Sequence, residues 1–292
     1  MKKKILILIS IIISLVFISY RVFNISPDII TEKTRHGSDD AAIWVNPENP
    51  DKSIIFGTDK DPDGAIYAFD LEGKIIEAKT IRGLKRSNNV DLQYNFKIND
   101  SLTVDVLAFT ERDKKQIRIF SVPDMKPLDS GGLSVFEDET NSKLREPMGI
   151  SLYSSPIDNV LYAIVSRKKG PKTNYLYQYE IVSDGNGVSF ELRRKFGNFS
   201  GEQEIEAVAV DNELGYIYYS DETHCVRKYF AEPSKGNKEL GCFGGGTFEG
   251  DIEGIALANF KNGTGYIIVS NQKKGSFNIF SRKKMSLSGK SI

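Results

Sequence analysis

Five apolar strands of this chain end in the same way, on a Thr or Ser that two further polar residues follow. The strand ends read IIFGTDK, VLAFTER, YAIVSRK, YIYYSDE and YIIVSNQ. Successive hydroxyl residues are separated by 52, 56, 54 and 50 positions, and they are Thr58, Thr110, Ser166, Ser220 and Ser270. A near-constant period of this length is typical of architectures in which one small structural unit is repeated.

Each repeat contains further strands on both sides of this ending. An apolar strand entered through polar residues precedes it, as in DDAAIWV, NNVDLQY, EPMGISLY, EAVAVD and EGIALAN. A strand rich in Tyr or Phe follows, as in AIYAFD, QIRIFSV, YLYQYEI, CVRKYFA and FNIFSR, and a fourth strand is visible in KIIEAKT and SFELRRKF. No helical period is sustained after Pro27. The pattern predicts an all-β fold, a β-propeller of four-stranded antiparallel blades with about five blades present.

The amino-acid composition limits the kinds of molecule that this protein is expected to bind. Lys+Arg and Asp+Glu both total 39, so the net charge is zero, which argues against a nucleic-acid-binding protein. The two cysteines, Cys225 and Cys242, could pair in an oxidising compartment or remain as two buried thiols.

The N-terminal residues resemble an export signal. Lys2, Lys3 and Lys4 precede an apolar run from Ile5 to Tyr20, which is short compared with the ~20 residues of a membrane span. We therefore expect residues 1–26 to be a signal peptide or a membrane anchor, and residues 27–292 to be the propeller domain. The protein would be extracellular, periplasmic or anchored to a membrane through this segment alone.

Acidic and amide residues recur where the first strand of each repeat begins. The positions are Asp39-Asp40, Asn88-Asn89, Glu146, Glu204 with Glu206, and Asp251 with Glu253. In a propeller the first strands line the central channel, so these side chains should converge on one mouth. Several close carboxylates cannot all stay ionised without a counter-charge, and Ca²⁺ accepts six to eight oxygen ligands. The pattern predicts a calcium site, although Asp, Glu and Asn are also common turn residues.

Basic residues recur at a second position. The third residue of the five strand endings is Lys60, Arg112, Lys168, Glu222 and Gln272 in turn. Three cations in register beside a ring of carboxylates indicate a site for an anion. Cations bridging carboxylates and flanked by Lys and Arg are typical of sites for phosphoryl groups.

The stretch TRHGSDD from Thr34 to Asp40 admits two interpretations. Arg35-His36-Gly37 begins like the motif of histidine acid phosphatases, in which the His is the nucleophile. That motif continues with a second Arg and a Pro in an α/β fold, and both are missing from this all-β pattern. We therefore interpret the Asp pair, and not His36, as the functional half of the stretch.

These motifs together resemble the β-propeller phytases, a family of six-bladed calcium-dependent phosphatases. The resemblance runs from about Gly37 to Arg282. It rests on D-D-A-A-I-W from Asp39, N-N-V-D from Asn88, E-A-V-A-V-D from Glu206, D-I-E-G from Asp251 and S-N-Q from Ser270.

The resemblance implies a phosphoric monoester hydrolase that uses several Ca²⁺ ions. Its substrate would be phytate (myo-inositol hexakisphosphate) or a similar polyphosphorylated molecule, attacked by metal-bound water, and the protein would be a monomer. The metal ligands implied are Asp39, Asp40, Glu206, Asp251, Glu253 and Gln272. The catalytic residues implied are Glu206, Glu222, Glu253, Lys60, Arg112 and Lys168, the three cations contacting phosphate.

Two of the departures from the family bear most on its site and fold. Met148 stands where the family has a Tyr, and only SRKKMSLSGKSI follows Phe280. From this we expect blade five to lack its fourth strand and the ring to lack its sixth blade, leaving a gap beside blade one. The alternatives are a degenerate, non-catalytic propeller that serves as an interaction module, or a lactonase-like propeller hydrolase. The basic residues favour an anionic substrate over a neutral lactone.

Overall fold

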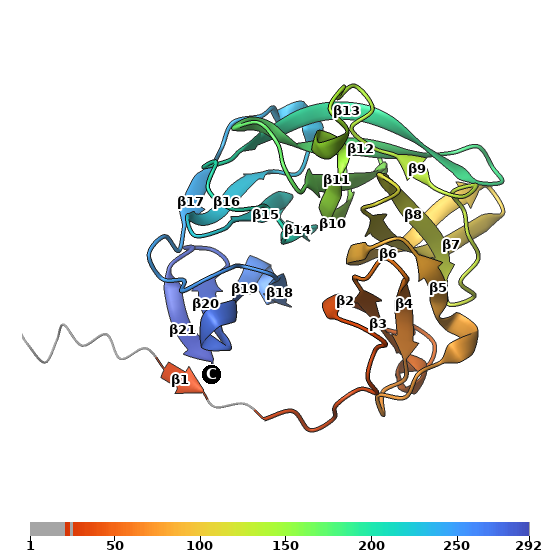
Figure 1. Ribbon diagram of the computed structural model, residues 1–292, viewed down its shortest axis with the longest axis horizontal. Helices are drawn as coiled ribbons and strands as arrows, with labels where there is room; N and C mark the ends of the chain where they lie inside the picture. The colour runs from red at the N-terminus through yellow and green to blue at the C-terminus, as the bar shows by residue number, and fades with distance from the viewer. Residues whose placement is uncertain (1–20, 24–25, 292) are drawn as a thin grey trace, which may run out of the picture.

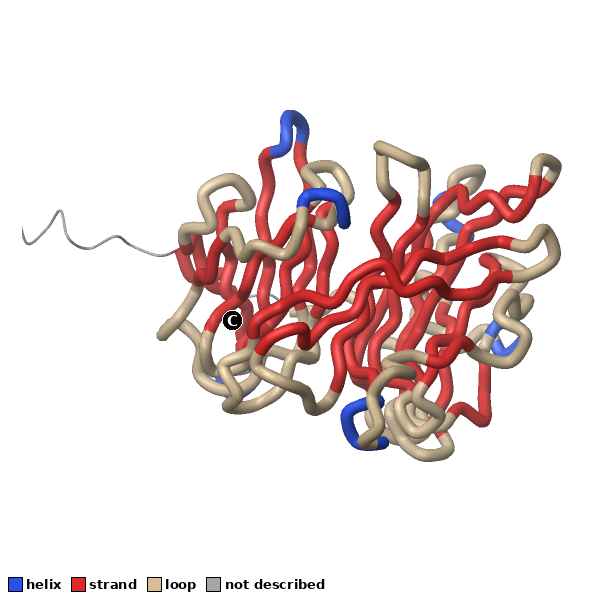
Figure 2. The backbone as a smooth tube through the Cα atoms, turned by 90° about the horizontal axis from the view of Figure 1, so that it is seen from above, coloured by secondary structure: helices blue, strands red, loops and turns tan. Residues whose placement is uncertain are grey.

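The computed structural model describes residues 21–23 and 26–291, so the apolar run Ile5–Tyr20 lies outside the described residues. Within the described part of the chain, no helix is both long enough and apolar enough to cross a membrane. The helical segments described there are 3-10 turns of three or four residues, which lie in the connections (Figure 2).

Five sheets surround a central channel, and the predicted all-β propeller is confirmed (Figure 1). Within each blade the strands pair antiparallel in the order of the sequence, from the channel outward. Blade one consists of β2 (Ser38–Trp44), β3 (Ile54–Asp59), β4 (Gly64–Phe69) and β5 (Ile81–Leu84). Blade two consists of β6 (Ser87–Asn99), β7 (Leu102–Glu111), β8 (Gln116–Val122) and β9 (Leu133–Ser134).

The other three blades repeat this plan. Blade three consists of β10 (Pro147–Ser154), β11 (Leu161–Arg167), β12 (Thr173–Ser183) and β13 (Val188–Asn198). Blade four consists of β14 (Val208–Asp211), β15 (Tyr216–Asp221), β16 (Cys225–Phe230) and β17 (Gly241–Phe243). Blade five consists of β18 (Ile255–Phe260), β19 (Thr264–Asn271), β20 (Ser276–Ser281) and β21 (Leu287–Ser291).

The expectation that blade five lacks a fourth strand was wrong. Strand β21 pairs antiparallel with β20, and β1 (Arg21–Phe23) adds to β21 in parallel. A turn between the two outer strands allows this, since Ser281 N–H donates to the Ser286 carbonyl at 2.8 Å. An outer strand needs few apolar side chains because backbone hydrogen bonds hold it. The stretch SRKKMSLSGKSI therefore lacks the alternation of apolar and polar residues by which a strand is predicted.

The predicted position of the fourth strand of blade one was also wrong. It is β5, and Glu77–Lys79 within KIIEAKT forms a 3-10 turn. The Thr80 hydroxyl accepts a hydrogen bond from Ala68 N–H at 3.2 Å, which satisfies an amide that a strand partner would otherwise bind. The other predicted fourth strand, SFELRRKF, is confirmed within β13.

The repeated Thr or Ser has one structural role in all five blades. Its side-chain oxygen accepts a hydrogen bond from a backbone N–H at the start of the first strand of the same blade. The bonds are Asp40 N to Thr58 (2.9 Å), Asn89 N to Thr110 (3.1 Å), Gly149 N to Ser166 (2.8 Å), Ala207 N to Ser220 (3.1 Å) and Glu253 N with Gly254 N to Ser270 (2.9 Å each).

In blades one, two and three these hydroxyls stand where regular pairing is interrupted. The register between first and second strands shifts after Ser38, Ser87 and Pro147, so the local amides lose their ladder partners. The hydroxyls replace those partners. Two of them also reach the next blade, because Thr110 donates to the Met148 carbonyl at 2.8 Å and Ser166 donates to the Ile205 carbonyl at 2.7 Å.

Apolar cores lie between neighbouring blades. Separate clusters join blades one and two, two and three, three and four, and four and five. Among the described residues no such cluster joins blade five to blade one. A groove of about 540 Å³ lies between these two blades instead, in agreement with the gap that the sequence led us to expect. Phe277 of β20, the third strand of blade five, lines this groove and is 49% exposed.

The N-terminal segment runs across the outer side of this gap (Figure 1). It leaves β1 on blade five and attaches to blade one, where the Glu32 carboxylate accepts Ile75 N–H at 2.8 Å and Arg35 N–H donates to the Tyr67 hydroxyl at 3.1 Å. The chain therefore links the two open blades without filling the space between their inner strands.

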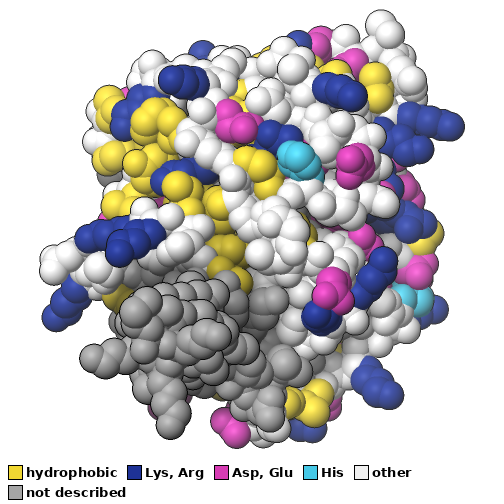
Figure 3. All heavy atoms as spheres, turned by 90° about the vertical axis from the view of Figure 1, so that its left-hand side faces the viewer, with side chains coloured by type: hydrophobic (Ala, Val, Ile, Leu, Met, Phe, Trp, Pro, Cys, Tyr) yellow, Lys and Arg dark blue, Asp and Glu magenta, His cyan; other side chains and the backbone are white. Residues whose placement is uncertain are grey.

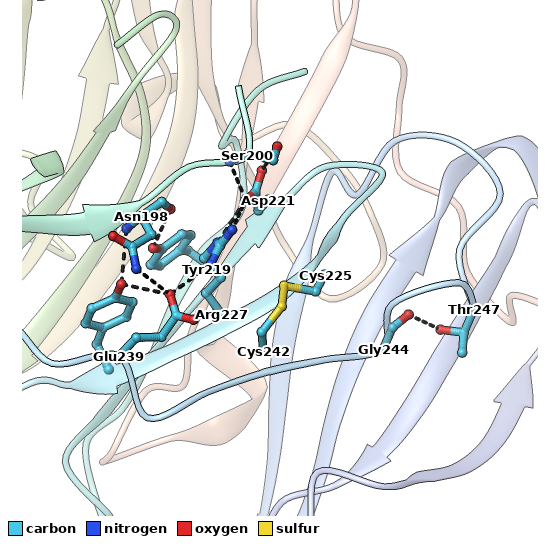
Figure 4. Close-up of a disulfide and its surroundings, with 11 residues drawn as sticks. Asn198, Ser200, Tyr219, Asp221, Cys225, Arg227, Glu239, Cys242, Gly244 and Thr247 are labelled. Carbon is cyan, nitrogen blue, oxygen red and sulfur yellow. Dashed lines mark hydrogen bonds and ion pairs between the residues drawn. A yellow bond between two sulfur atoms is a disulfide. The ribbon is translucent and has the colours of Figure 1, made fainter. Parts of the chain in front are cut away.

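The two cysteines, whose pairing the sequence left open, form a disulfide between Cys225 of β16 and Cys242 of β17 (Figure 4). Beside it the Arg227 guanidinium is paired with Asp221 and Glu239 at 2.7 and 2.9 Å. The disulfide therefore fixes the outer edge of blade four.

Figure 3 shows the neighbouring side of the molecule, where lysine, arginine and apolar side chains are interspersed.

Replacement of one hydroxyl tests its role in the fold. Ser166→Ala removes the partner of both Gly149 N–H and the Ile205 carbonyl, and both groups lie in a buried region. Leaving buried polar groups unsatisfied costs about 1–3 kcal/mol, so we expect a loss of this size in urea unfolding. The control is Ser189→Ala on the exposed face of β13. Equal, small losses in the two variants would contradict this role.

Candidate functional site

The hydroxyl anchors place one residue of each blade at the same mouth of the channel. The residue that directly precedes the anchored amide occupies an equivalent position in every blade. These residues are Asp39, Asn88, Met148, Glu206 and Glu253. Sequence periodicity predicted four of these positions as polar, and Met148 is the apolar member of the ring.

Three of these residues bring their carboxylates together. Oxygen atoms of Asp39, Glu206 and Glu253, from blades one, four and five, lie within 4.8 Å of one another. Asn88 completes the group, since its Nδ2 donates to Asp39 Oδ2 at 2.9 Å and lies 3.5 Å from Glu206 Oε1. The Oδ1 atom of Asn88 is buried and has no hydrogen-bond partner among the described residues.

This crowding disfavours ionisation of the carboxyl groups. Burial, and then the charges of Asp39 and Glu253, raise the pKa of Glu206 to about 9. Burial also raises the pKa of Glu253, and burial with the charge of Asp251 raises the pKa of Glu222 to about 8. Clustered carboxyl groups with raised pKa values lack counter-charge, which is the environment that a bound cation corrects.

Basic side chains and carboxylates together line a cavity of about 260 Å³. Lys60 is paired with Asp39, and Lys168 is paired with Glu204. Arg112 has no such partner within the described residues: one guanidinium nitrogen contacts Met148 Sδ, and its buried Nε has no hydrogen-bond acceptor. Burial lowers the pKa of Arg112, as expected for a cation whose hydration is not replaced.

Most of the residues predicted from the sequence lie in this cavity. Seven of them line it, namely Lys60, Arg112, Lys168, Glu206, Glu222, Asp251 and Glu253. Asp39 joins them through the carboxylate cluster.

Two predicted metal ligands lie apart. The Asp40 carboxylate turns along the channel, where Asn89 Nδ2 and Val90 N–H donate to it at 3.1 Å each, and burial raises its pKa to about 7. Gln272 is exposed, and only its backbone N–H reaches the Asp251 carbonyl, at 3.3 Å. The two halves of the Asp pair therefore face different surroundings, because alternate residues of a strand point to opposite sides.

Two lining residues had been given no role in the site, Arg86 and Gln203. Glu204, which also lines the cavity, belongs to the acidic pattern at the start of the first strand of blade four. Arg86 gave no signal because it lies in the connection between blades one and two, outside the repeated strand endings.

The two histidines lie elsewhere. His36 Nδ1 is 3.2 Å from Asp59 Oδ2, and the same carboxylate oxygen accepts His36 N–H at 3.1 Å. His224 is exposed next to Cys225 and Cys242, a group that could hold a metal only without the disulfide, which occupies both sulfur atoms. Neither histidine lines the cavity.

The fold and the cavity define a class of protein, an all-β propeller with an acidic and basic site at one mouth of its channel. The profile of the phytase family matches residues 4–290, and the chain belongs to that family. It is 31% identical over 253 residues to the 3-phytase of Bacillus subtilis (strain 168), an alignment that covers 84% of this chain. The chain spans 62% of the length of that relative.

The carboxylate cluster makes a testable contribution to stability. The pKa of Glu206 is higher in the folded protein, about 9, than the ordinary value of 4.5, so the folded state binds the proton more tightly. In chelator, this contribution to the free energy of unfolding should be fully present below about pH 4.5 and decline as the pH rises toward 9. Glu206→Gln, which cannot ionise, should gain stability relative to the wild type as the pH rises.

Urea unfolding at several pH values between 5 and 9, in chelator, measures this difference. The control is Glu48→Gln, because Glu48 is exposed and does not line the cavity. A stability difference between Glu206→Gln and wild type that stays constant with pH would show that the Glu206 carboxyl is not perturbed by its neighbours.

Proposed function

We propose that this protein is an exported, calcium-dependent phosphomonoesterase that acts on phytate or a similar polyphosphorylated molecule. One observation carries the proposal: a cluster of three converging carboxylates lies at the cavity that Lys60, Arg112 and Lys168 line. Membership of the phytase family supports the same reaction class.

The donor set fits calcium. Asp39, Glu206 and Glu253 would hold one ion, because Ca²⁺ prefers oxygen ligands and carboxylates above all. The side chain of Asn88, whose Nδ2 donates to Asp39, would offer its Oδ1, which has no partner among the described residues, to the ion only after its amide group turned over. Asp251 lines the same cavity and would hold a further ion. When bound, calcium supplies positive charge for phosphate oxygens and lowers the pKa of water.

The basic residues would bind and orient the phosphate. Arg112 is held in the wall with donors free for an anion, and a planar guanidinium can bind two phosphate oxygens at once. Lys60 and Lys168 are paired with Asp39 and Glu204 in the absence of substrate. Each could exchange its carboxylate for a phosphate oxygen, most readily when a cation occupies the carboxylate cluster.

Glu222 would handle a proton. Burial and the charge of Asp251 raise its pKa to about 8, so without a bound cation its carboxyl group stays largely protonated at neutral pH. One of its oxygens is 3.3 Å from Glu204 N–H, which fixes the carboxyl group in the cavity wall. A protonated carboxyl group at this position can donate its proton to the oxygen of the departing alcohol.

A non-catalytic propeller is the alternative that one observation favours. Met148 places an apolar side chain in a ring whose other four members are polar. A lactonase-like hydrolase is supported less well, since a neutral lactone gives the three cations no partner.

Export rests on separate support. In the sequence, Lys2–Lys4 precede the apolar run Ile5–Tyr20, which is the pattern of an export signal. The disulfide between Cys225 and Cys242 is a kind of bond that persists in oxidising compartments. We propose that the protein lies outside the cytoplasm as a monomer, in contact with a membrane through its N-terminal segment alone.

Calcium should stabilise the folded protein by mass action, by about 2.7 kcal/mol at a free concentration 100 times Kd. Differential scanning calorimetry across millimolar calcium should show a rising Tm. Glu253→Gln should abolish most of the increase, because it removes one carboxylate from the cluster. Glu249→Gln is the matched control, an exposed glutamate four positions away. A Tm that does not change with calcium in the wild-type protein would refute the proposed metal site.

Release of phosphate from phytate, measured in calcium and then in chelator, tests the proposed activity. Arg112→Ala should lower kcat/KM about 10²–10³-fold, the usual loss when one donor to developing charge is removed. Arg35→Ala is the charge-matched control, because Arg35 forms an exposed pair with Asp63. His36→Ala should change little. No phosphate release by the wild-type protein in calcium would favour the non-catalytic alternative, and loss of activity in His36→Ala alone would favour the histidine mechanism.

A further inference from the structure

The residue that directly follows the repeated Thr or Ser is polar and buried in all five blades. These residues are Asp59, Glu111, Arg167, Asp221 and Asn271, each at most 3% exposed. None of them lines the cavity. Burying a charged or polar side chain costs free energy unless hydrogen bonds satisfy it. The partners of these side chains therefore indicate what they contribute.

Each of these side chains binds the connection that leads into the first strand of its own blade. The bonds are His36 N to Asp59 (3.1 Å), Lys85 N to Glu111 (2.8 Å), Arg167 Nη1 to the Leu144 carbonyl (3.2 Å), Ser200 N to Asp221 (2.8 Å, Figure 4) and Glu249 N to Asn271 (2.8 Å). The partner on the connection is a backbone group in every blade, so the bond requires no particular side chain there.

The residues at the channel mouth lie between these bonds and the hydroxyl bonds. Asp39 lies three positions after His36, whose amide Asp59 binds. The hydroxyl of Thr58 binds the amide that directly follows Asp39. In the other blades the equivalent residue lies three to six positions after the bonded connection residue. A short segment bonded at both ends has little conformational freedom, so it holds its side chain in one place.

We infer that the buried polar residue after the hydroxyl positions the carboxylate cluster in the three blades that supply its members. The positioning residues are Asp59 for Asp39, Asp221 for Glu206 and Asn271 for Glu253. This inference rests on the proposed calcium site, and the three residues act through the backbone of the connections. Outer partners that orient metal ligands typically contribute about 10–100-fold to metal affinity.

The charge of Asp59 could favour a cation without any positioning, since a carboxylate near a cation attracts it in any orientation. Two features of the structure separate these explanations. Asn271 is neutral, so its replacement by Ala changes no charge. Asp59 Oδ1 is buried without a partner among the described residues, so an amide nitrogen in its place breaks no hydrogen bond. Asp59→Asn therefore removes the charge and keeps an oxygen that can accept His36 N–H.

Titration calorimetry with calcium, after removal of bound metal by chelator, measures the effect on the cluster. Asp59→Ala and Asn271→Ala should each bind calcium about tenfold more weakly than wild type, because each loses the acceptor for its connection. Asp59→Asn should keep most of the affinity. Asp129→Ala is the matched control, because Asp129 is a buried carboxylate that accepts Ile119 N–H at 2.8 Å and does not line the cavity. It should bind calcium as wild type does.

Hydrogen exchange in chelator tests the positioning without calcium. Amides of residues 36–40 should exchange about tenfold faster in Asp59→Ala than in wild type, and at nearly the wild-type rate in Asp59→Asn and Asp129→Ala. If Asp59→Ala does not fold, Asn271→Ala provides the same measurement over residues 249–253.

The outcomes separate this inference from the proposed function. Wild-type protein that binds calcium but releases no phosphate would refute the proposed activity and leave the positioning role to the calorimetry. Wild-type protein that binds no calcium would refute the proposed metal site, and hydrogen exchange would then decide the positioning. Unchanged exchange in the Ala variants, unchanged calcium affinity in Asn271→Ala, or equal losses in Asp59→Asn and Asp59→Ala would overturn the inference.

Discussion

The site depends on the hydrogen bond between a strand-two hydroxyl and a strand-one amide. In blade four, Ser220 holds Ala207 N–H, and the residue just before that amide is Glu206. In blade one, Thr58 does the same for Asp40 N–H and so places Asp39. In blades one, two and three the bond lies at a register shift at the start of the first strand, where the hydroxyl satisfies an amide that has no ladder partner. One interaction, repeated in each blade, therefore positions both the strands and the carboxylates.

This explains how much of the fold the sequence could predict. The repeated Thr or Ser is buried and polar, so it gives a sharp periodic signal, and the blades followed from its spacing. Outer strands carry no such constraint, because few of their side chains are buried. Strand β21 was missed and the fourth strand of blade one was placed several residues early for that reason, while the longer β13, which packs Phe196 into the core, was found.

The candidate site was predictable to the same extent. Carboxylates in register with the hydroxyl motif converge as expected, and Lys60, Arg112 and Lys168 line the cavity beside them. Periodicity alone could not decide which member of the Asp39-Asp40 pair faces the cluster, because that depends on the bulge at the strand start. It also could not find Arg86, whose position depends on two backbone hydrogen bonds in a connection between repeats.

The carboxylate cluster also bears on the open side of the ring. Asp39 belongs to blade one and Glu253 to blade five, the two blades that flank the groove in which no shared apolar core is described. Between other neighbours, buried side chains hold the blades together. Across the groove, the inner strands instead present like charges that repel each other when ionised. A cation bound by both carboxylates converts that repulsion into attraction. In this propeller the proposed metal site would thus serve two purposes, since the ion that prepares the cavity for phosphate also joins the first and last blades.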